Sequence, residues 1–379
     1  MPSRDQRKSR ASQSVPLNNA TQTQKRRVSH GQKKEHASNA QNRNTVKRRR
    51  RALIAGGAGF IGSHLAESLL KQGYFVFAVD NFRTGRRVNI EPLLAHPHFS
   101  FFPLDITEPA FFHKFSSIHL DEIYNLACPT GVPNLGPLAE EMLLTSSIGA
   151  RQTLELARIH NARLLFTSTA EIYGQPEVVP IPEHYSGNVH PLGPRSAYEE
   201  GKRFAESLHS MYVRKFGVDA RIVRVFNTYG PNMSLDDKRV IPQFVRSVIE
   251  GTPLIVYGDG SQTRSHIYVD DQISGIRAVM ERGIPGEAYN IGGSVELSIR
   301  ELAETVLRIA GITGGISFVP HFIEDHRRRA PLLDKAMALG WRQEIPLEAG
   351  LAYLLAHHHI IPPASRESLG HSSETVAAG

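Results

Sequence analysis

Short apolar runs of the kind found in buried β-strands alternate along the chain with longer segments in which apolar residues recur every three or four positions. The apolar runs stand at 52–56, 74–79, 99–104, 122–127, 163–168 and 220–226. The helical patterns stand near 60–72, 138–160, 198–216, 240–250, 270–282, 298–310 and 346–358. Strands that are apolar throughout are covered on both faces, so this alternation predicts an α/β fold with a doubly wound parallel sheet.

The pattern changes after about residue 230, where the strands become short and scattered, as at 254–257. We therefore predict a main domain over 51–235 and a smaller, mixed α/β region over 236–360 that is interlocked with it. Within the second region, Ser298 and Glu301 have the spacing of a capping box, which marks the start of a helix.

The first 50 residues differ from the rest in composition and charge. They hold 14 Lys and Arg, only two acids, Asp5 and Glu35, and no aromatic residue. The whole chain has 44 basic and 37 acidic residues, so residues 51–379 hold 30 and 35 and carry a net charge of −5. Because such a segment cannot bury enough apolar surface to offset its ordering entropy, we predict a disordered basic tail over 1–50. The Ser- and Pro-rich end, 361–379, is predicted to be disordered as well. The slightly acidic body argues against nucleic acid as its partner, and the contacts of the tail stay open.

The single cysteine, Cys128, excludes an intramolecular disulfide and indicates a reducing compartment, so we predict a cytoplasmic protein. The most apolar stretch, 52–70, is interrupted by glycines, His64 and Glu67, so we predict no membrane span. The cysteine and histidines do not have the spacing of a zinc site, so we predict no metal.

Three glycines stand between the first predicted strand and the first predicted helix, in the sequence GGAGFIG. Such a turn brings backbone N–H groups and the start of the helix up to a pyrophosphate. Asp80 ends the next strand, where a carboxylate accepts hydrogen bonds from the adenosine ribose and repels a 2′-phosphate. The order of strand, turn, helix, strand and acid predicts a Rossmann-type site for NAD rather than NADP. We assign to it Gly56, Gly59, Phe60, Ile61, Gly62, Asp80, Asn81, Asp105 and Ile106, with a surface turn as the alternative for Asp105.

Tyr198 and Lys202 form a Y-x-x-x-K pair on a predicted helix. Residues four apart lie on one helix face, so the ammonium group can stand beside the phenol, lower its pKa and make it a base at neutral pH. Thr169 and Glu171 follow the fifth predicted strand, and ligands of a doubly wound sheet bind at the carboxyl ends of its strands. We therefore expect Thr169, Glu171 and Tyr198 to converge beside the nicotinamide.

Together these segments resemble the UDP-glucuronate decarboxylases (UDP-xylose synthases), a family of the extended short-chain dehydrogenase/reductases within the NAD-dependent epimerase/dehydratase superfamily. The resemblance spans roughly 51–358. It is carried by GGAGFIGSHL at 56–65, VDNFRTGRR at 79–87, STAEIYGQPEVVP at 168–180, GPRSAYEEGKRFAE at 193–206, FNTYGPNM at 226–233 and YGDGSQTR at 257–264. The block from Glu183 to Arg195 resembles the decarboxylases in particular.

The resemblance implies an enzyme in which NAD⁺ takes a hydride from C4 of the glucuronosyl ring while Tyr198, beside Thr169, takes the hydroxyl proton. The β-keto acid then loses its C6 carboxylate as CO₂, and NADH reduces C4 again, so that NAD is recycled. Lys202 and Glu171 would assist, and Arg329 would stand near the sugar carboxylate. A solvated basic loop is the alternative for Arg329, because two further arginines adjoin it.

The resemblance also implies which residues hold the nucleotide and how the protein assembles. Asn227 and Arg264 match positions that bind the diphosphate, and Tyr185 and Arg239 are further candidates for the UDP pocket. The helices predicted at 138–160 and 198–216 carry apolar residues on more than one face, and their equivalents pair across a dimer, so a homodimer is expected.

Several positions depart from the family pattern. Ala170 stands where a serine is usual, Asn232 where an arginine is usual, and Leu332 where an acid is usual. Ala170 also removes the acid that a sugar 4,6-dehydratase needs beside Glu171, which disfavours dehydration. A UDP-uronate 4-epimerase, or another nucleotide-sugar epimerase or dehydratase, remains the first alternative. A non-catalytic NAD(P)-sensing or RNA-binding member of the fold is the second.

Overall fold

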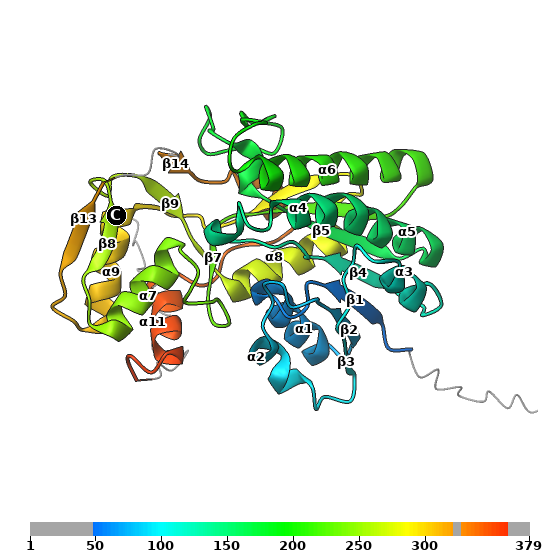
Figure 1. The fold of residues 1–379 in the computed structure, drawn as a ribbon, viewed down its shortest axis with the longest axis horizontal. Coiled ribbons are helices and arrows are strands. Elements are labelled where there is room, and N and C mark those ends of the chain that lie inside the picture. The colour runs from blue at the N-terminus through cyan, green and yellow to red at the C-terminus, as the bar shows by residue number, and fades with distance from the viewer. Residues whose placement is uncertain (1–47, 321–326, 363–379) are drawn as a thin grey trace, which may run out of the picture. The chain divides into compact units, whose positions relative to one another are not determined.

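A seven-stranded parallel sheet forms the centre of the computed structural model, which describes residues 48–320 and 327–362. Its strands run in the order β11-β6-β5-β4-β1-β2-β3 (Figure 1). They are β1 (Arg51–Ala55), β2 (Phe75–Val79), β3 (Phe99–Phe102), β4 (Glu122–Asn125), β5 (Arg163–Thr169), β6 (Ala220–Val225) and β11 (Ala288–Ile291). The strand order reverses between β1 and β4, which is where a doubly wound sheet opens a crevice for its ligand. The predicted Rossmann-type sheet is confirmed.

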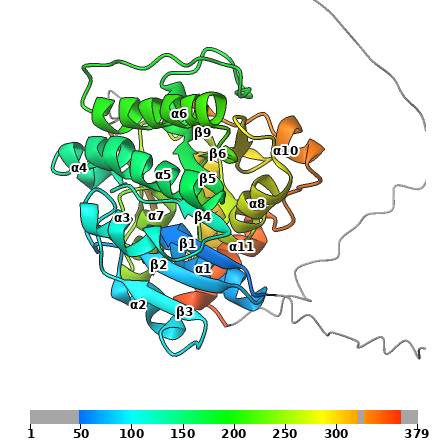
Figure 2. The same cartoon turned by 90° about the vertical axis from the view of Figure 1, so that its right-hand side faces the viewer.

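Helices cover both faces of this sheet (Figures 1 and 2). One face carries α1 (Phe60–Lys71) and α8 (Val269–Arg282), and the other carries α3 (Pro109–Ser116), α5 (Ala150–His160) and α6 (Ser196–Phe216). The alternation along β1 divides the core accordingly, because Ala52 and Ile54 pack on the first face while Leu53 and Ala55 pack on the second. All four are fully buried, as expected for a strand that is apolar throughout.

The chain between α3 and α6 contains further short elements beside the sheet. They are α4 (Ala139–Leu144), a π-helical segment over Thr145–Gly149 that leads into α5, and a 3₁₀ turn over Ala170–Tyr173 directly after β5. A short α2 (Arg87–Ile90) follows β2. The single helix predicted over 138–160 is therefore two helices joined by a π-helical turn.

The smaller region is mixed, with short strands and several helices. Its elements are β7 (Thr228–Tyr229), α7 (Val240–Glu250), β8 (Leu254–Tyr257), β9 (Thr263–Ser265), β10 (Ile267–Tyr268), β12 (Glu296–Ser298), α9 (Ile299–Ala310), β13 (Ile316–Val319), β14 (Arg328–Arg329), α10 (Asp334–Ala338) and α11 (Leu347–His357). Strand β9 pairs antiparallel with β12 and parallel with β14. The chain then returns to the main sheet through β11, which pairs with β6. The smaller region and the main sheet are therefore interlocked along the chain. The capping box at the start of α9 is confirmed, with reciprocal bonds between Ser298 and Glu301.

Arg48 and Arg50 contact the body, although the predicted tail extends to residue 50. Arg48 donates to Asp121 over 2.5 Å, and Arg50 donates to the hydroxyl of Tyr74 over 2.9 Å. The predictions made for 1–47 and 363–379 lie outside the described residues.

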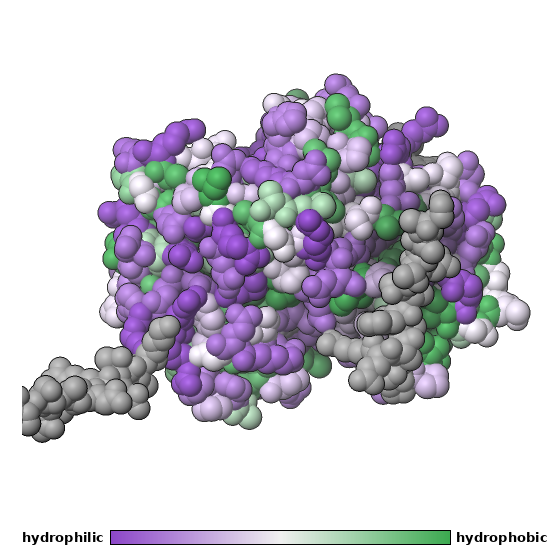
Figure 3. All heavy atoms as spheres, turned by 180° about the vertical axis from the view of Figure 1, so that it is seen from behind, coloured by the Kyte–Doolittle hydropathy of each residue, from purple (hydrophilic) through white to green (hydrophobic). Residues whose placement is uncertain are grey.

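The surface of the described chain mixes polar and apolar side chains, and on the face shown in Figure 3 the apolar ones stand in small, separate groups. In the described part of the chain, no helix combines the length and apolarity needed to cross a membrane.

Candidate active site

A cavity of about 1410 Å³ opens at the carboxyl ends of the sheet strands and extends to the smaller region. It is lined by the glycine turn, the ends of β2, β4, β5 and β6, the start of α6, and residues of the smaller region such as Tyr257 and Arg264. Almost every residue assigned from the sequence faces it. These are Gly56, Gly59, Phe60, Ile61, Gly62, Asp80, Asn81, Asp105, Ile106, Thr169, Glu171, Tyr198, Lys202, Asn227, Arg239, Arg264 and Arg329.

The glycine turn is packed against itself and open only at its middle glycine. A Cβ at Gly62 would stand 2.1 Å from the carbonyl oxygen of Gly56, so the start of α1 lies directly on the turn. Gly56 has a φ of +83° and backs onto the main chain of Ala127. A Cβ at Gly59 would stand 3.2 Å from the carbonyl oxygen of Gly56, and Gly59 lines the cavity. A pyrophosphate can therefore approach the backbone at Gly59 and the N-terminus of α1, which fits a dinucleotide.

Asp80 is held by the backbone of the loops around it. Its carboxylate accepts hydrogen bonds from the N–H of Ala58 over 3.0 Å and of Phe82 over 2.8 Å. The side chain is buried, and burial raises the pKa of Asp80 above its usual value. Gly85 lies against it, since a Cβ there would meet Oδ1 at 2.6 Å. Backbone N–H groups thus hold both carboxylate oxygens of Asp80 at the edge of the cavity.

Asp105 is tied to the end of β2 through Asn81, which donates to its Oδ2 over 2.7 Å. Burial pushes the pKa of Asp105 up, but hydrogen bonds from Thr107 and Asn81 outweigh this and hold the pKa below its usual value. Asp105 is therefore an anion at neutral pH, and it faces the cavity beside Ile106.

Tyr198 and Lys202 stand on successive turns of α6, as predicted, but their electrostatics differ from the prediction. Burial raises the pKa of the Tyr198 phenol, although a hydrogen bond with Thr169 acts in the opposite direction. The ammonium group of Lys202 donates to the carbonyl oxygen of Thr167 over 2.9 Å, and burial lowers its pKa. The expected lowering of the tyrosine pKa is wrong for the protein alone, because burial outweighs the favourable contacts of the phenol.

Glu171 lies between two arginines. Its Oε2 accepts a hydrogen bond from Arg195 over 2.6 Å, and its Oε1 forms an ion pair with Arg329 of β14. Arg329 is buried, and its Nε has no hydrogen-bond partner within residues 48–320 and 327–362. The alternative for Arg329 was a side chain in a solvated basic loop. The burial of Arg329 and its ion pair with Glu171 do not agree with that alternative.

Arg195 was not among the site residues predicted from the sequence. A signal for it existed, because Arg195 and Glu199 have the i,i+4 spacing of a helical ion pair just ahead of Tyr198.

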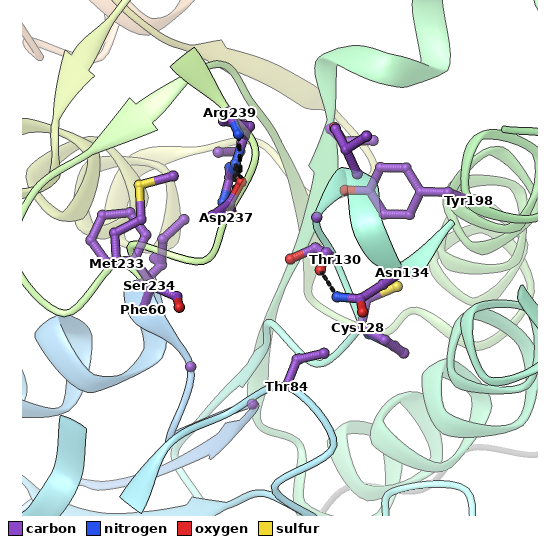
Figure 4. A pocket seen from close by; sticks show the side chains of 18 of the residues that line it. Phe60, Thr84, Cys128, Thr130, Asn134, Tyr198, Met233, Ser234, Asp237 and Arg239 are labelled. Carbon is purple, nitrogen blue, oxygen red and sulfur yellow. Dashed lines mark hydrogen bonds and ion pairs between the residues drawn. The ribbon is translucent and has the colours of Figure 1, made fainter. Parts of the chain in front are cut away.

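Four residues were assigned to the nucleotide pocket, and the cavity contains three of them. Arg264 is buried and donates to the carbonyl of Thr263 over 2.8 Å. Arg239 forms a forked ion pair with Asp237, and Figure 4 shows the pair across the cavity from Tyr198. Asn227 lines the same wall.

Tyr185, the fourth of these residues, is not among those that line the cavity, and its assignment to the UDP pocket stays a prediction. Its ring lies 6.2 Å from that of Tyr173, and its hydroxyl accepts a hydrogen bond from the N–H of Glu177 over 3.3 Å. It packs beside a small hydrophobic cluster that includes Tyr173 and Phe226. The aromatic ring thus serves the packing of the 174–195 segment.

Cys128 and His266 are among the cavity residues that were not assigned from the sequence. Cys128 lies near Tyr198 and Lys202, and burial raises the pKa of its thiol (Figure 4). His266 is buried beside Arg264, and burial lowers its pKa to about 3, so its ring is neutral. No group of His, Cys, Asp and Glu side chains in the described part of the chain is arranged to hold a metal ion.

The glycine turn, the acid after β2 and the Tyr/Lys pair on one doubly wound sheet are the features of a nicotinamide-dependent enzyme of the short-chain dehydrogenase type. Residues 52–292 match the NAD dependent epimerase/dehydratase family, and the chain belongs to that family.

Curated relatives share much of the sequence. The chain is 42% identical over 306 residues to UDP-glucuronic acid decarboxylase 1 of Xenopus tropicalis, which covers 80% of this chain and 71% of that protein. It is 42% identical over 303 residues to UDP-glucuronic acid decarboxylase 5 of Arabidopsis thaliana, covering 79% of this chain and 87% of that protein.

Solved structures of the family resemble it as well. UDP-glucose 4-epimerase from Thermotoga maritima, solved with UDP-glucose, has a TM-score of 0.75 and 27% identity, covering 82% of this chain and 98% of that one. UDP-glucuronic acid 4-epimerase from Bacillus cereus, in complex with NAD and a fluorinated UDP-glucuronic acid, has a TM-score of 0.73 and 28% identity, with coverages of 82% and 98%.

Proposed function

We propose that this protein decarboxylates UDP-glucuronate to UDP-xylose through a 4-keto intermediate, with NAD as a recycled cofactor. The observation that carries the proposal is one cavity in which Tyr198 and Thr169 stand beside a Glu171 carboxylate paired with Arg329. The identity of 40–42% to curated UDP-glucuronic acid decarboxylases supports it.

The residues present fit NAD. The turn from Gly56 to Gly62 would receive the pyrophosphate, and Asp80 would accept hydrogen bonds from the adenosine ribose. Asp105 and Ile106 would lie beside the adenine. NAD bound there supplies a hydride acceptor for C4 of the sugar and later returns the hydride.

Tyr198 is the proposed base for the C4 hydroxyl, and Thr169 the group that hydrogen-bonds the same oxygen. Burial keeps the phenol protonated in the protein alone, so its proton leaves only where positive charge offsets burial. Lys202 is a fixed ammonium group one turn further along α6 and supplies such a charge.

Arg329 and Glu171 are proposed to act on the carboxylate side of the sugar. Once C4 is a carbonyl, it accepts the electrons of the bond from C5 to C6, and CO₂ leaves. A guanidinium group attracts the C6 carboxylate, and a carboxylate held beside it can guide the proton that C5 then receives. Asn227, Arg239 and Arg264 would hold the UDP, because guanidinium forks suit phosphate oxygens.

The test is incubation of the protein with UDP-glucuronate and NAD⁺, with CO₂ and the sugar nucleotides followed by mass spectrometry. We expect release of CO₂ and accumulation of UDP-xylose. UDP-galacturonate without loss of mass would support a 4-epimerase instead, an alternative that the likeness to the Bacillus cereus enzyme keeps in view. Absence of turnover with any nucleotide sugar, although NAD binds, would favour a sensor.

We further propose that the protein is a homodimer. Leu143 of α4, Ile148 of the π-helical segment and Phe204 of α6 are each about half exposed (46%, 46% and 53%). These elements pack side by side, so the side chains belong to one continuous part of the surface. Apolar residues gathered in this way mark an interface between proteins.

We also propose a cytoplasmic location. Its support is the single cysteine, Cys128, which indicates a reducing compartment.

A further inference from the structure

The first two turns of α6 carry two pairs of side chains with the same spacing. Tyr198 and Lys202 form the pair assigned to the oxidation of C4. Arg195 and Glu199 form a second i,i+4 pair, with 3.0 Å between Nε and Oε1. Both pairs lie at the start of the same helix, so the helix fixes their positions relative to each other.

Arg195 links Glu199 to Glu171. Its Nη2 lies 2.6 Å from Oε2 of Glu171, while Arg329 occupies the other oxygen of that carboxylate. Each oxygen of Glu171 therefore has one guanidinium partner, and the plane of the carboxylate is fixed from both sides. The loss of either arginine would remove one of these two contacts from the carboxylate.

Glu199 lies behind Arg195. It is 4% exposed and does not line the cavity, whereas Arg195 and Glu171 do. Burial raises the pKa of Glu199, and the hydrogen bond from Arg195 opposes this effect. Glu199 can reach a bound substrate only through Arg195.

We propose that Arg195 and Glu199 are positioning residues, in which Glu199 orients Arg195 and Arg195 holds Glu171 for the steps that follow the oxidation of C4. The proposal rests on the proposed function. The guanidinium group of Arg195 donates to Glu199 and to Glu171, whereas the ammonium group of Lys202 donates to the carbonyl of Thr167. Since Ala170 brings no hydroxyl to this place, the orientation of the Glu171 carboxylate matters more for proton delivery to C5.

The test separates the steps of one turnover. In rapid mixing of the full-length protein with NAD⁺ and UDP-glucuronate, NADH absorbance reports the oxidation of C4 and trapped CO₂ reports decarboxylation. In Glu199→Gln we expect NADH to form at nearly the wild-type rate, while its reoxidation and the release of UDP-xylose slow on the order of tenfold to a hundredfold, as for a reacting group misplaced by about 1 Å. A larger share of UDP-4-keto-pentose should be released, and KM should stay within about twofold.

Controls distinguish positioning from damage to the fold. Glu200→Gln, at the next helix position and 40% exposed, should behave as wild type. Glu199→Asp keeps the charge and should recover part of the lost rate. In a Glu171→Gln background, Glu199→Gln should add little, because the group it orients has been changed.

Two results would overturn the inference. One is that Glu199→Gln slows NADH formation as much as the later steps, which would show an effect on Tyr198 through α6. The other is full additivity with Glu171→Gln. Failure of the proposed function is a different result, since the wild-type protein would then release no CO₂ from UDP-glucuronate.

Discussion

Tyr198 shows how a single buried hydroxyl sets the chemistry of the site. We predict that Tyr198→Phe lowers kcat about 10²-fold to 10⁴-fold, the range for loss of a general base, while NAD binding changes little. Turnover of UDP-glucuronate and calorimetric titration with NAD⁺ measure the two quantities. Tyr212→Phe, further along α6 where the hydroxyl binds Glu155, is the matched control and should keep full activity. Robust turnover by Tyr198→Phe would refute the assignment.

The buried side chain of His209 makes the free energy of unfolding depend on pH. Its Nδ1 bonds the carbonyl of Ala205, its ring stacks on Phe166, and its Nε2 is buried with no partner in the described chain. Burial lowers its pKa from 6.5 to about 4. Between these values the unfolded chain binds the proton and the folded protein does not, so stability falls as pH falls from about 6.5 towards 4.

The expected loss from His209 alone is on the order of 2 kcal/mol between pH 8 and pH 5. Urea unfolding at the two pH values measures it. In His209→Phe, which removes the titrating group and keeps a ring against Phe166, the difference between the two pH values should shrink by that amount. An unchanged difference would show that other groups cause the acid sensitivity.

At the scale of residues, the sequence predicts positions better than contacts, because the partners of a side chain depend on the tertiary fold. Spacing was enough to predict that Tyr198, Lys202 and Thr169 share a cavity, since a helix face and a strand end fix their directions. It did not reveal that the ring of Tyr185 packs near Tyr173, because tertiary packing sets the path of the 174–195 segment. The raised pKa of Tyr198 could not be predicted either, since burial is a property of the fold.

The strand, turn and helix around the glycines form the element that meets the cofactor. A Cβ at Gly62 would collide with the backbone of Gly56, whereas a Cβ at Gly59 would point to the cavity with one neighbour at 3.2 Å. We predict that Gly62→Ala lowers the free energy of unfolding by about 1–3 kcal/mol or more, the cost of overpacking where the neighbouring backbone cannot move. Gly59→Ala should instead weaken NAD binding at least tenfold with little change in the unfolding temperature. Calorimetric titration and thermal unfolding separate the two outcomes, and equal loss of stability in both variants would contradict the prediction.

At the scale of elements, long apolar strands were predictable and short or irregular elements were not. All six predicted runs overlap a strand closely, as 163–168 does with β5. Strand β11 (Ala288–Ile291) was missed, because Asn290 interrupts its short apolar run. The helix predicted over 138–160 is interrupted by a π-helical turn, where the hydroxyl of Ser147 donates to the carbonyl of Leu143 and competes with the helical bond.

At the scale of the molecule, the net charge of +7 comes from the first 50 residues, which carry +12 with 14 basic and two acidic residues. The body carries −5 and still has to bind two anions. It can do so because a few cationic groups face the cavity, among them Arg264, Arg329 and Lys202. Arg329 and Lys202 are held in place by Glu171 and by the carbonyl of Thr167. The binding of anions therefore depends on where individual cationic groups are held and not on the total charge of the body.

The exposed apolar residues of α4 and α6 lead to a prediction about the oligomeric state of the protein. If Leu143, Ile148 and Phe204 are covered by a second copy, an aspartate at Phe204 would be buried without a partner. The cost of such a charge, about 3 kcal/mol or more, weakens association over a hundredfold. Light scattering at micromolar concentration should therefore show a dimer for the wild type and a monomer for Phe204→Asp. Ile284→Asp, an equally exposed apolar position (61%) in the loop after α8, is the control and should remain dimeric. A wild-type monomer, or a dimer that survives Phe204→Asp, would assign this surface another role.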